Sequence, residues 1–304
     1  MKTAPASPLT QCRCPVCDGS ARSRFYKYGY AIHGCDRCGH WFVDPASLDQ
    51  PGVQHLHQVY SDTYFQGGGA GYRDYLAEAA LLRQHGRRYA RRLGRYMAPG
   101  RVLDVGTAAG FVLQGLVDGG WQGQGVEPNP RMAEYGRRHL GLAITTGSLE
   151  DLSANRQFDL ITMIQVVPHF FDLRRALTTA SALTAPGGYW LIETWNRRSW
   201  TARALGPHWH EYSPPSVLHW FSPPDLTALV GQYGFVTVAQ GRPQKWINAA
   251  HGKSLLDYKL RDLGWLGHGL RRLLPLVPDG LCLPYLADDV FWLLARKQAA
   301  PRSP

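Results

Sequence analysis

The sequence lacks a long hydrophobic run, and this absence limits where the protein can work. A bilayer span needs about 18 consecutive apolar residues, and no such window occurs among the 304 residues. The first ten residues, MKTAPASPLT, also lack the apolar segment of a secretion signal. The most apolar late stretch is interrupted by Arg271 and Arg272. We therefore expect a soluble, cytoplasmic protein without a membrane span.

Cysteine is scarce, and five of the six cysteines lie within the first 38 residues. Two C-x2-C pairs, Cys14 with Cys17 and Cys35 with Cys38, are separated by 17 residues. This spacing is typical of a four-thiolate zinc site. Disulfides are the competing interpretation, which the missing secretion signal disfavours. Because four sulfur ligands leave no open coordination position, the zinc should stabilise a small ribbon domain, residues 1–48, and do no chemistry. Lower-ranked ligands nearby are Cys12, His33 and His40.

Charge of one sign dominates: the formal net charge is +10. Such a charge permits nucleic acids, acidic metabolites or anionic membranes as partners. Much of it lies on one predicted helix, where arginines recur every four residues with others beside them: Arg83, Arg87, Arg88, Arg91, Arg92 and Arg95. A solvated helix face is the preferred interpretation of this stripe. RNA binding stays open, although no aromatic RNA-binding signature accompanies the arginines.

Short apolar runs alternate with helical patterns from Arg101 onward, which is typical of a parallel sheet covered on both faces. Strands are predicted at 101–106, 123–127, 143–146, 158–167, 187–194, 235–239 and 290–297. Helices are predicted at 110–120, 130–140, 172–183 and 223–234. Asn129 is expected to cap the second of these helices, with Pro130 at its first position.

The first strand runs into a glycine loop, LDVGTAAGF, that lacks two well-known phosphate motifs. A dinucleotide fingerprint needs a second glycine where Ala108 stands. No Gly-Lys-Ser/Thr follows, which excludes a P-loop. The loop carries Asp104, Gly106 and Gly110, and Glu127 ends the next strand. Because a carboxylate can accept both hydrogen bonds from a ribose diol, the arrangement favours a nucleoside with a cationic amino-acid tail.

Four stretches, VLDVGTAAGFVLQGL, GVEPNP, FDLITMIQVVPHFFD and LTAPGGYWLIETWN, resemble the ordered motifs of class I S-adenosylmethionine (SAM) dependent methyltransferases. Together with the paired cysteines they are similar to a bacterial subgroup that has an N-terminal zinc ribbon and often modifies metabolites or glycans. The resemblance implies an α/β, Rossmann-like seven-stranded sheet whose last strand is antiparallel. It further implies a SAM-binding domain at 100–304, preceded by a helical linker and cofactor lid at 49–99.

The resemblance also implies which residues hold SAM. The loop, the acid and the ends of the next strands are expected to bind it, with tyrosines of the upstream segment folding over it: Tyr64, Tyr72, Asp104, Gly106, Thr107, Gly110, Glu127, Pro128, Ser148, Leu149 and Gln165. Tyr75 is a further lid candidate. The family often has Asp at the position of Ser148. SAM and a structural Zn²⁺ are thus the expected cofactors.

Acceptor-side residues are expected after the fourth and fifth strands. His169 stands where the subgroup has a histidine and is the candidate base or acceptor contact, although the preceding subgroup glutamate is here Pro168. An insertion at about 195–222 starts at the carboxyl end of a strand, where ligands bind in such sheets. It is rich in candidate acceptor residues: Trp195, His208, His210, Glu211 and Tyr212. A two-histidine metal site at His208 and His210 is a low-ranked alternative.

A second insertion, at about 241–287, has the pattern of one or two amphipathic basic helices. It could cover the acceptor, mediate dimerisation or lie on an anionic lipid surface.

We expect transfer of a methyl group to a small molecule, which could be a secondary metabolite, a glycan precursor or a lipid-linked compound. Two alternatives are an RNA methyltransferase that uses the ribbon and the arginine helix, and a SAM-binding module without activity. The sequence leaves open the acceptor, its methylated atom and the oligomeric state.

Overall fold

A seven-stranded sheet forms the centre of the computed structural model, which describes residues 11–48, 59–65, 74–153, 156–244, 246–249, 253, 276, 278, 281–284 and 288–298. Its spatial order is β11-β14-β9-β8-β5-β6-β7. Five strands pair in parallel: β5 (Arg101–Val105), β6 (Gln122–Glu127), β7 (Ala143–Thr146), β8 (Phe158–Ile164) and β9 (Thr184–Trp195). The last strand, β14 (Val290–Lys297), is antiparallel to both neighbours, β9 and β11 (Phe235–Gly241). The predicted fold is confirmed.

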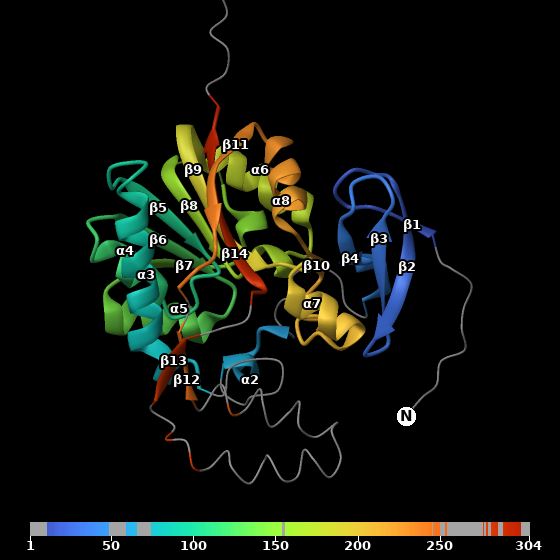
Figure 1. Ribbon diagram of the computed structural model, residues 1–304. Helices are drawn as coiled ribbons and strands as arrows, with labels where there is room; N and C mark the ends of the chain where they lie inside the picture. The colour runs from blue at the N-terminus through green and yellow to red at the C-terminus, as the bar shows by residue number, and fades with distance from the viewer. Residues whose placement is uncertain are drawn as a thin grey trace, which may run out of the picture.

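Helices cover both faces of this sheet (Figure 1). One face packs against α3 (Ala79–Leu93), α4 (Phe111–Val117) and α5 (Pro130–Leu140) through apolar residues that include Leu93 and Leu113. The other packs against α6 (Leu173–Leu183) and α8 (Pro223–Gly231). Asn129 caps α5 by accepting from Met132 N, with Pro130 at the first position, as predicted. Burial on both faces explains why the central strands are nearly continuous apolar runs.

Strand β8 is shorter than predicted, and the reason is a tertiary contact. The apolar pattern continues to residue 167, but the strand ends at Ile164. Gln165 adopts a left-handed conformation with φ of 58°, and its N–H donates to the carbonyl oxygen of Glu193 on β9 at 2.8 Å. The chain then forms the short helix η4 (Val167–His169).

A second sheet lies beside the first and contains the N-terminal cysteines (Figure 1). It is antiparallel, with the order β1 (Gln11–Arg13), β2 (Ser20–Lys27), β3 (Tyr30–Cys35), β4 (Trp41–Val43) and β10 (His219–Trp220). Strand β10 comes from the predicted acceptor insertion, far along the chain. No local pattern predicts this pairing, which joins the ribbon to the methyltransferase-like part.

The remaining elements are short. They are η1 (Pro45–Ser47), α2 (Asp62–Phe65), η2 (Leu76–Glu78), η3 (Leu149–Asp151), α7 (Trp200–Leu205), η5 (Gly206–His208), β12 (Trp246–Asn248) and β13 (Cys282–Pro284). Strands β12 and β13 pair with each other, whereas most of the amphipathic segment predicted at 241–287 lies outside the described residues. Within the described ranges, no helix has both the length and the apolar character needed to cross a membrane.

Helices α3 and α4 meet at two glycines, so their backbones are in direct contact. A Cβ on Gly86 would lie 2.1 Å from the carbonyl oxygen of Val112. A Cβ on Gly115 would lie 2.2 Å from the carbonyl oxygen of Arg83. Because backbone atoms cannot move aside as a flexible side chain does, a methyl group at either position must separate the helices.

Gly86→Ala should therefore lower the free energy of unfolding by about 2 kcal/mol, the usual effect of overpacking a close contact. Gly231→Ala is the control, since Gly231 is also a helical glycine, at the end of α8, but a Cβ there meets nothing within 4 Å. Urea unfolding of both variants measures the difference. Equal midpoints for the two variants would show that the helix contact is not tight.

Candidate functional site

The loop between β5 and α4 has a backbone that few residues can adopt. Gly106 and Gly110 have φ of +62° and +86°, and Ala108 between them has φ of +49°. A Cβ on Gly106 would lie 2.7 Å from Cγ2 of Val166. The left-handed conformation of Ala108 is uncommon for a residue with a side chain. It aims the Ala108 N–H at Oε2 of Glu127, which accepts at 2.8 Å.

Two buried carboxylates flank this loop. Glu127 is 3% exposed, and its Oε1 accepts from the N–H of Asn129 at 2.8 Å. Burial raises the pKa of Glu127 to about 7. Asp104 accepts from the hydroxyls of Thr107 and Thr162 at 2.7 and 2.6 Å, and burial raises its pKa to about 6. Each oxygen of Glu127 has a second lone pair that can accept from a further donor.

Adjacent parallel strands bring the other predicted cofactor residues to the same edge of the sheet. Pro128 follows Glu127 and is half-buried. After β7, the Gly147 N–H donates to the Glu127 carbonyl at 2.9 Å, which holds Ser148 and Leu149 beside the end of β6. The Ser148 hydroxyl donates to Asp151 at 2.8 Å, and Leu149 is buried in the core.

Gln165 stands at the end of β8, and its amide is oriented by a buried acid. Its Nε2 donates to Oε1 of Glu193 at 3.0 Å, whereas its Oε1 is buried and has no hydrogen-bond partner among the residues that the structure describes. The other oxygen of Glu193 accepts from Tyr89 and lies 2.9 Å from Nε2 of His85, both on α3. A buried acceptor without a donor is costly. The site therefore suits a ligand that donates a hydrogen bond to Gln165 Oε1.

The segment 59–65 packs over the carboxyl end of β6. Asn129 Nδ2 donates to the carbonyl oxygen of Tyr60 at 2.9 Å and to Asp62 at 3.3 Å. The Tyr64 ring lies 5.1 Å from the Tyr60 ring, centroid to centroid. Tyr75 stacks on Phe111 with a centroid distance of 5.6 Å. Tyr72, also predicted as a lid residue, lies outside the described residues.

His169 contacts both this segment and the predicted acceptor insertion. Its Nδ1 lies 2.6 Å from the carbonyl oxygen of Ser216, and its ring meets those of Tyr60 and Trp195 edge-on at 5.6 Å each. Since a carbonyl can only accept, Nδ1 carries the proton and Nε2 has the lone pair. Burial lowers the pKa of His169 to about 4. The side chain is therefore neutral near pH 7 and offers a basic nitrogen.

Tyr60 is a residue that sequence reasoning missed. Its hydroxyl donates to the same Ser216 carbonyl at 2.8 Å. Tyr60 opens the YSDTYF stretch in which Tyr64 was singled out, and only the fold could show that it meets His169.

The other predicted acceptor residues lie in different environments. Trp195 is half-buried beside His169. His210 and Glu211 form a partly buried pair with Nε2 and Oε1 2.8 Å apart. Tyr212 is buried in a cluster of aromatic rings with Phe25, Trp209 and Trp220, and His208 is exposed. Within the described residues, His208 and His210 belong to no group of three or more possible metal ligands, so the structure gives the two-histidine alternative no support.

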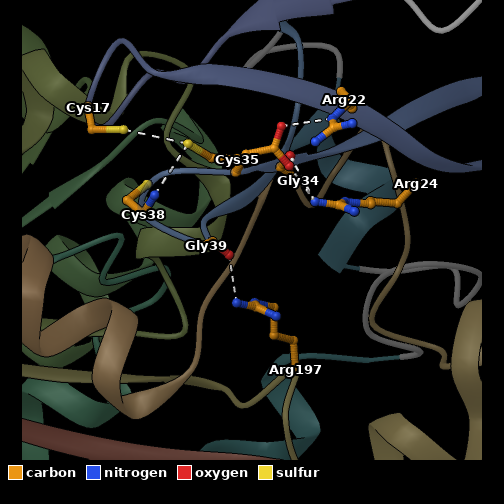
Figure 2. Close-up of polar contacts among 9 residues, drawn as sticks. Cys17, Arg22, Arg24, Gly34, Cys35, Cys38, Gly39 and Arg197 are labelled. Atoms are coloured by element: carbon orange, nitrogen blue, oxygen red, sulfur yellow. Dashed lines mark hydrogen bonds and ion pairs between the residues drawn. The ribbon is translucent and has the colours of Figure 1, made fainter.

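Cys14, Cys17, Cys35 and Cys38 form the group that could hold a metal ion, with all four sulfurs within 4.8 Å of one another. The Cys14–Cys38 and Cys17–Cys35 sulfur distances are 3.6 and 3.5 Å. Four sulfurs at about 2.3 Å from a tetrahedral zinc are separated by about 3.8 Å. The donor set therefore fits zinc. Figure 2 shows three of these cysteines on the turns that flank β2 and β3. The lower-ranked ligands Cys12, His33 and His40 are not part of the group.

The arginine stripe on α3 is largely used within the protein. Arg83 and Arg87 both pair with Asp118, each with an N–O distance of 2.7 Å. Arg88 donates to the carbonyl oxygen of Gln244 at 2.8 Å, and Arg92 lies over the Trp292 ring at 4.5 Å. These contacts favour a structural role for this helix face.

Three comparisons relate the chain to known proteins. Residues 75–240, more than half of the chain, match the family model described as "Methyltransferase domain". A ubiquinone biosynthesis O-methyltransferase of Nitrobacter winogradskyi is 32% identical over 125 residues, which cover 40% of this chain and 46% of that protein. Its counterpart in Bradyrhizobium sp. is 31% identical over 127 residues, covering 40% and 47%. The chain thus spans about half the length of the curated relatives it matches.

Solved structures show the same fold at low sequence identity. A Burkholderia thailandensis 1,6-didemethyltoxoflavin-N1-methyltransferase, with S-adenosylhomocysteine bound, has a TM-score of 0.52 at 17% identity, covering 91% of this chain and 99% of that one. The YcgJ protein of Bacillus subtilis has a TM-score of 0.51 at 16% identity, covering 71% and 100%. The chain therefore belongs to the methyltransferase domain family and has the fold of the class I SAM-dependent methyltransferases.

Proposed function

We propose that this protein transfers a methyl group from SAM to a small-molecule acceptor. The observation that carries the proposal is the buried carboxylate of Glu127, held by two backbone N–H groups beside the left-handed turn at residues 106–110. Its remaining lone pairs suit the two hydroxyls of a ribose. The family match supports the same assignment.

The methionine end of the cofactor is assigned to the neighbouring strand. Gln165 Oε1 accepts no hydrogen bond from the described part of the chain and suits the ammonium group of SAM. Asp104 and Thr107 support the loop through their mutual hydrogen bond. The rest of the proposed cofactor shell follows from the order of the strands and the position of the lid: Tyr64, Tyr72, Gly106, Gly110, Pro128, Ser148 and Leu149.

The acceptor side is assigned to His169. When bound, SAM supplies a methyl group activated by its sulfonium. His169 Nε2 would take the proton from an acceptor nucleophile as that nucleophile attacks, and the Ser216 carbonyl keeps the imidazole in the required tautomer. Trp195 touches His169 and is the first of the proposed acceptor contacts, which also include His208, His210, Glu211 and Tyr212.

A small molecule is the preferred acceptor class because the stripe of arginines is occupied by contacts inside the protein. The curated relatives are named O-methyltransferases, so hydroxyl compounds are the first acceptors to test. Metabolites, glycan precursors and lipid-linked compounds all belong to this class.

Calorimetry with two ligands tests the cofactor assignment. Wild-type protein should bind both S-adenosylhomocysteine and methylthioadenosine, which lacks the amino-acid tail. Glu127→Ala should weaken both ligands by about 10- to 100-fold, the effect of losing hydrogen bonds to a charged group. Gln165→Leu should weaken S-adenosylhomocysteine by about tenfold and leave methylthioadenosine unchanged.

The matched control is Glu134→Gln, which removes an exposed carboxylate of α5 that pairs with Arg137. It should bind both ligands as the wild type does. Failure of the wild type to bind S-adenosylhomocysteine would remove the proposed function. An equal loss of both ligands in Gln165→Leu would place Gln165 away from the tail.

We also propose that residues 1–48 are a ribbon domain stabilised by one zinc ion, with 49–99 as linker and lid and 100–304 as the SAM-binding domain. Cys35→Ser should lose the metal and lower the thermal midpoint, because binding of a structural zinc contributes directly to folding. Cys12→Ser is the control and should retain one zinc per chain, since Cys12 lies outside the four-sulfur group. Metal analysis of the purified variants decides the point. Retention of zinc by Cys35→Ser would contradict the assignment.

The protonation of His169 is testable without knowing the acceptor. Because burial holds its pKa near 4, below the ordinary value of about 6.5, the side chain should stay neutral from pH 8 down to about 5. Nitrogen NMR of the imidazole should show the proton on Nδ1 throughout this range, with His169→Gln used to assign the signals.

The contribution of neutral His169 to the free energy of unfolding should be present above pH 6.5 and be lost as the pH falls toward 4. The reason is that only the unfolded chain takes up the proton in that interval. A titration midpoint near 6.5, or a proton on Nε2, would contradict the proposed base.

A further inference from the structure

Residues 168–170 form the turn that contains His169, and each of them makes a hydrogen bond with segment 216–220. The three contacts are Leu218 N donating to Pro168 O at 2.8 Å, His169 Nδ1 donating to Ser216 O at 2.6 Å, and His219 Nε2 donating to Phe170 O at 2.9 Å. Helix η4 is only one turn long and makes few hydrogen bonds of its own. Its position, and that of the His169 ring, therefore depends on segment 216–220.

The opposite edge of this segment belongs to the cysteine-bearing sheet. His219 and Trp220 form β10 and pair with β4, opposite Phe42 and Trp41. The Val43 N–H donates to the Leu218 carbonyl at 2.9 Å. Segment 216–220 thus lies between the ribbon and the His169 turn and is bonded to both.

Two buried histidines also connect the ribbon, segment 216–220 and the turn that contains His169. His40 Nε2 lies 3.1 Å from His219 Nδ1, and the two rings stack at 5.3 Å. The Phe170 carbonyl can only accept, so His219 carries its proton on Nε2 and accepts at Nδ1. His40 must then donate from Nε2. The hydrogen bonds therefore run in one direction, from the ribbon through His219 to the residue after His169.

A second contact between the ribbon and the acceptor side is made by Gly39, the residue between Cys38 and His40. Arg197 Nη2 donates to the Gly39 carbonyl at 2.6 Å, and Figure 2 shows this contact beside the cysteines. The same nitrogen pairs with Asp225 at 2.7 Å, and both side chains are only 8% exposed. Arg197 comes two residues after Trp195, the other ring that meets His169. The residues on both sides of the proposed acceptor site, His169 and Trp195, are thus connected to the turn that follows Cys38, the last cysteine of the four-sulfur group.

We infer that the ribbon positions the acceptor side of the active site, with His40 and His219 as positioning residues for His169 and Arg197 as the positioning residue for Trp195. This inference rests on the proposed function. The cofactor side is linked to segment 216–220 only indirectly among the described contacts, through Tyr60, which donates to Ser216 O and accepts from Asn129 Nδ2. Glu127, Ala108 and Gln165 themselves are held by residues of the seven-stranded sheet, of the α5 cap and of α3. The ribbon should therefore affect His169 without affecting SAM binding.

Hydrogen exchange on the full-length zinc-loaded chain tests the inference. His219→Phe keeps a ring of similar size but removes both histidine hydrogen bonds. Exchange of the amides at 166–171 should become about tenfold faster, since local opening then breaks fewer contacts. The calorimetric affinity for S-adenosylhomocysteine and the zinc content should stay at the wild-type values. The nitrogen NMR signals of His169 should show a mixture of tautomers.

A pair of substitutions on the ribbon side separates positioning from packing. His40→Leu should accelerate exchange at 166–171 as His219→Phe does, whereas His40→Gln keeps a donor for His219 and should restore most of the protection. Asp36→Asn is the control, because Asp36 forms ion pairs with Arg22 and Arg24, whose side chains are exposed. It should leave exchange at 166–171 unchanged.

Wild-type exchange at 166–171 in both His219→Phe and His40→Leu would overturn the inference, as would acceleration by His40→Gln equal to that by His40→Leu. A loss of zinc in His40→Leu leaves His219→Phe, which is distant from the cysteines in sequence, as the deciding variant. Failure of the wild type to bind S-adenosylhomocysteine would remove the proposed function alone, and the exchange results would still decide whether the ribbon positions the turn.

Discussion

Burial of the Glu127 carboxylate is the constraint on which the proposed cofactor side of this structure depends. A carboxylate removed from water must be compensated by hydrogen bonds, and both partners here are backbone N–H groups, of Ala108 and Asn129. The first requires a left-handed alanine in the loop. The second places Asn129 so that its side chain caps α5 and also holds the carbonyl oxygen of Tyr60. The loop, helix α5 and segment 59–65 are thus organised around one buried carboxyl group.

The elements that the sequence predicted well are those whose pattern is local. Strands β7 and β14 and helix α5 have the predicted bounds, because apolar runs and the Asn-Pro cap specify them without distant partners. The end of β8 was mispredicted, since the turn at Gln165 is made by a bond to Glu193 on another strand. Strand β10 was missed because it has two residues and pairs with a strand almost 180 positions earlier. Such pairings leave no periodicity to detect.

The residues of the candidate site also divide into those that local sequence patterns predicted and those that only the fold brings together. The four cysteines could be chosen from spacing alone, because two tight turns and a hairpin bring the sulfurs together whatever surrounds them. Glu127 and the glycine loop could be chosen because they stand at the ends of consecutive predicted strands. The surroundings of His169 could not be predicted, because they come from two segments far apart in the sequence, Tyr60 from segment 59–65 and Ser216 from segment 216–220. The arginine periodicity on α3 was real, yet only the fold revealed Asp118 as its partner.

These differences arise because the two sides of the candidate site are formed by different parts of the chain. The cofactor side consists of successive strands and loops of one sheet, so its geometry follows from the fold that the whole family shares. The proposed acceptor side is assembled from segment 59–65, the insertion and the cysteine-bearing ribbon. The Ser216 carbonyl accepts from both His169 and Tyr60, and the ribbon bonds the same segment at Leu218. A carbonyl that fixes a tautomer controls the basic nitrogen without touching the acceptor. If the proposed sites are correct, changes in the ribbon or the insertion can therefore alter acceptor chemistry while the Glu127 carboxylate and its loop stay as they are.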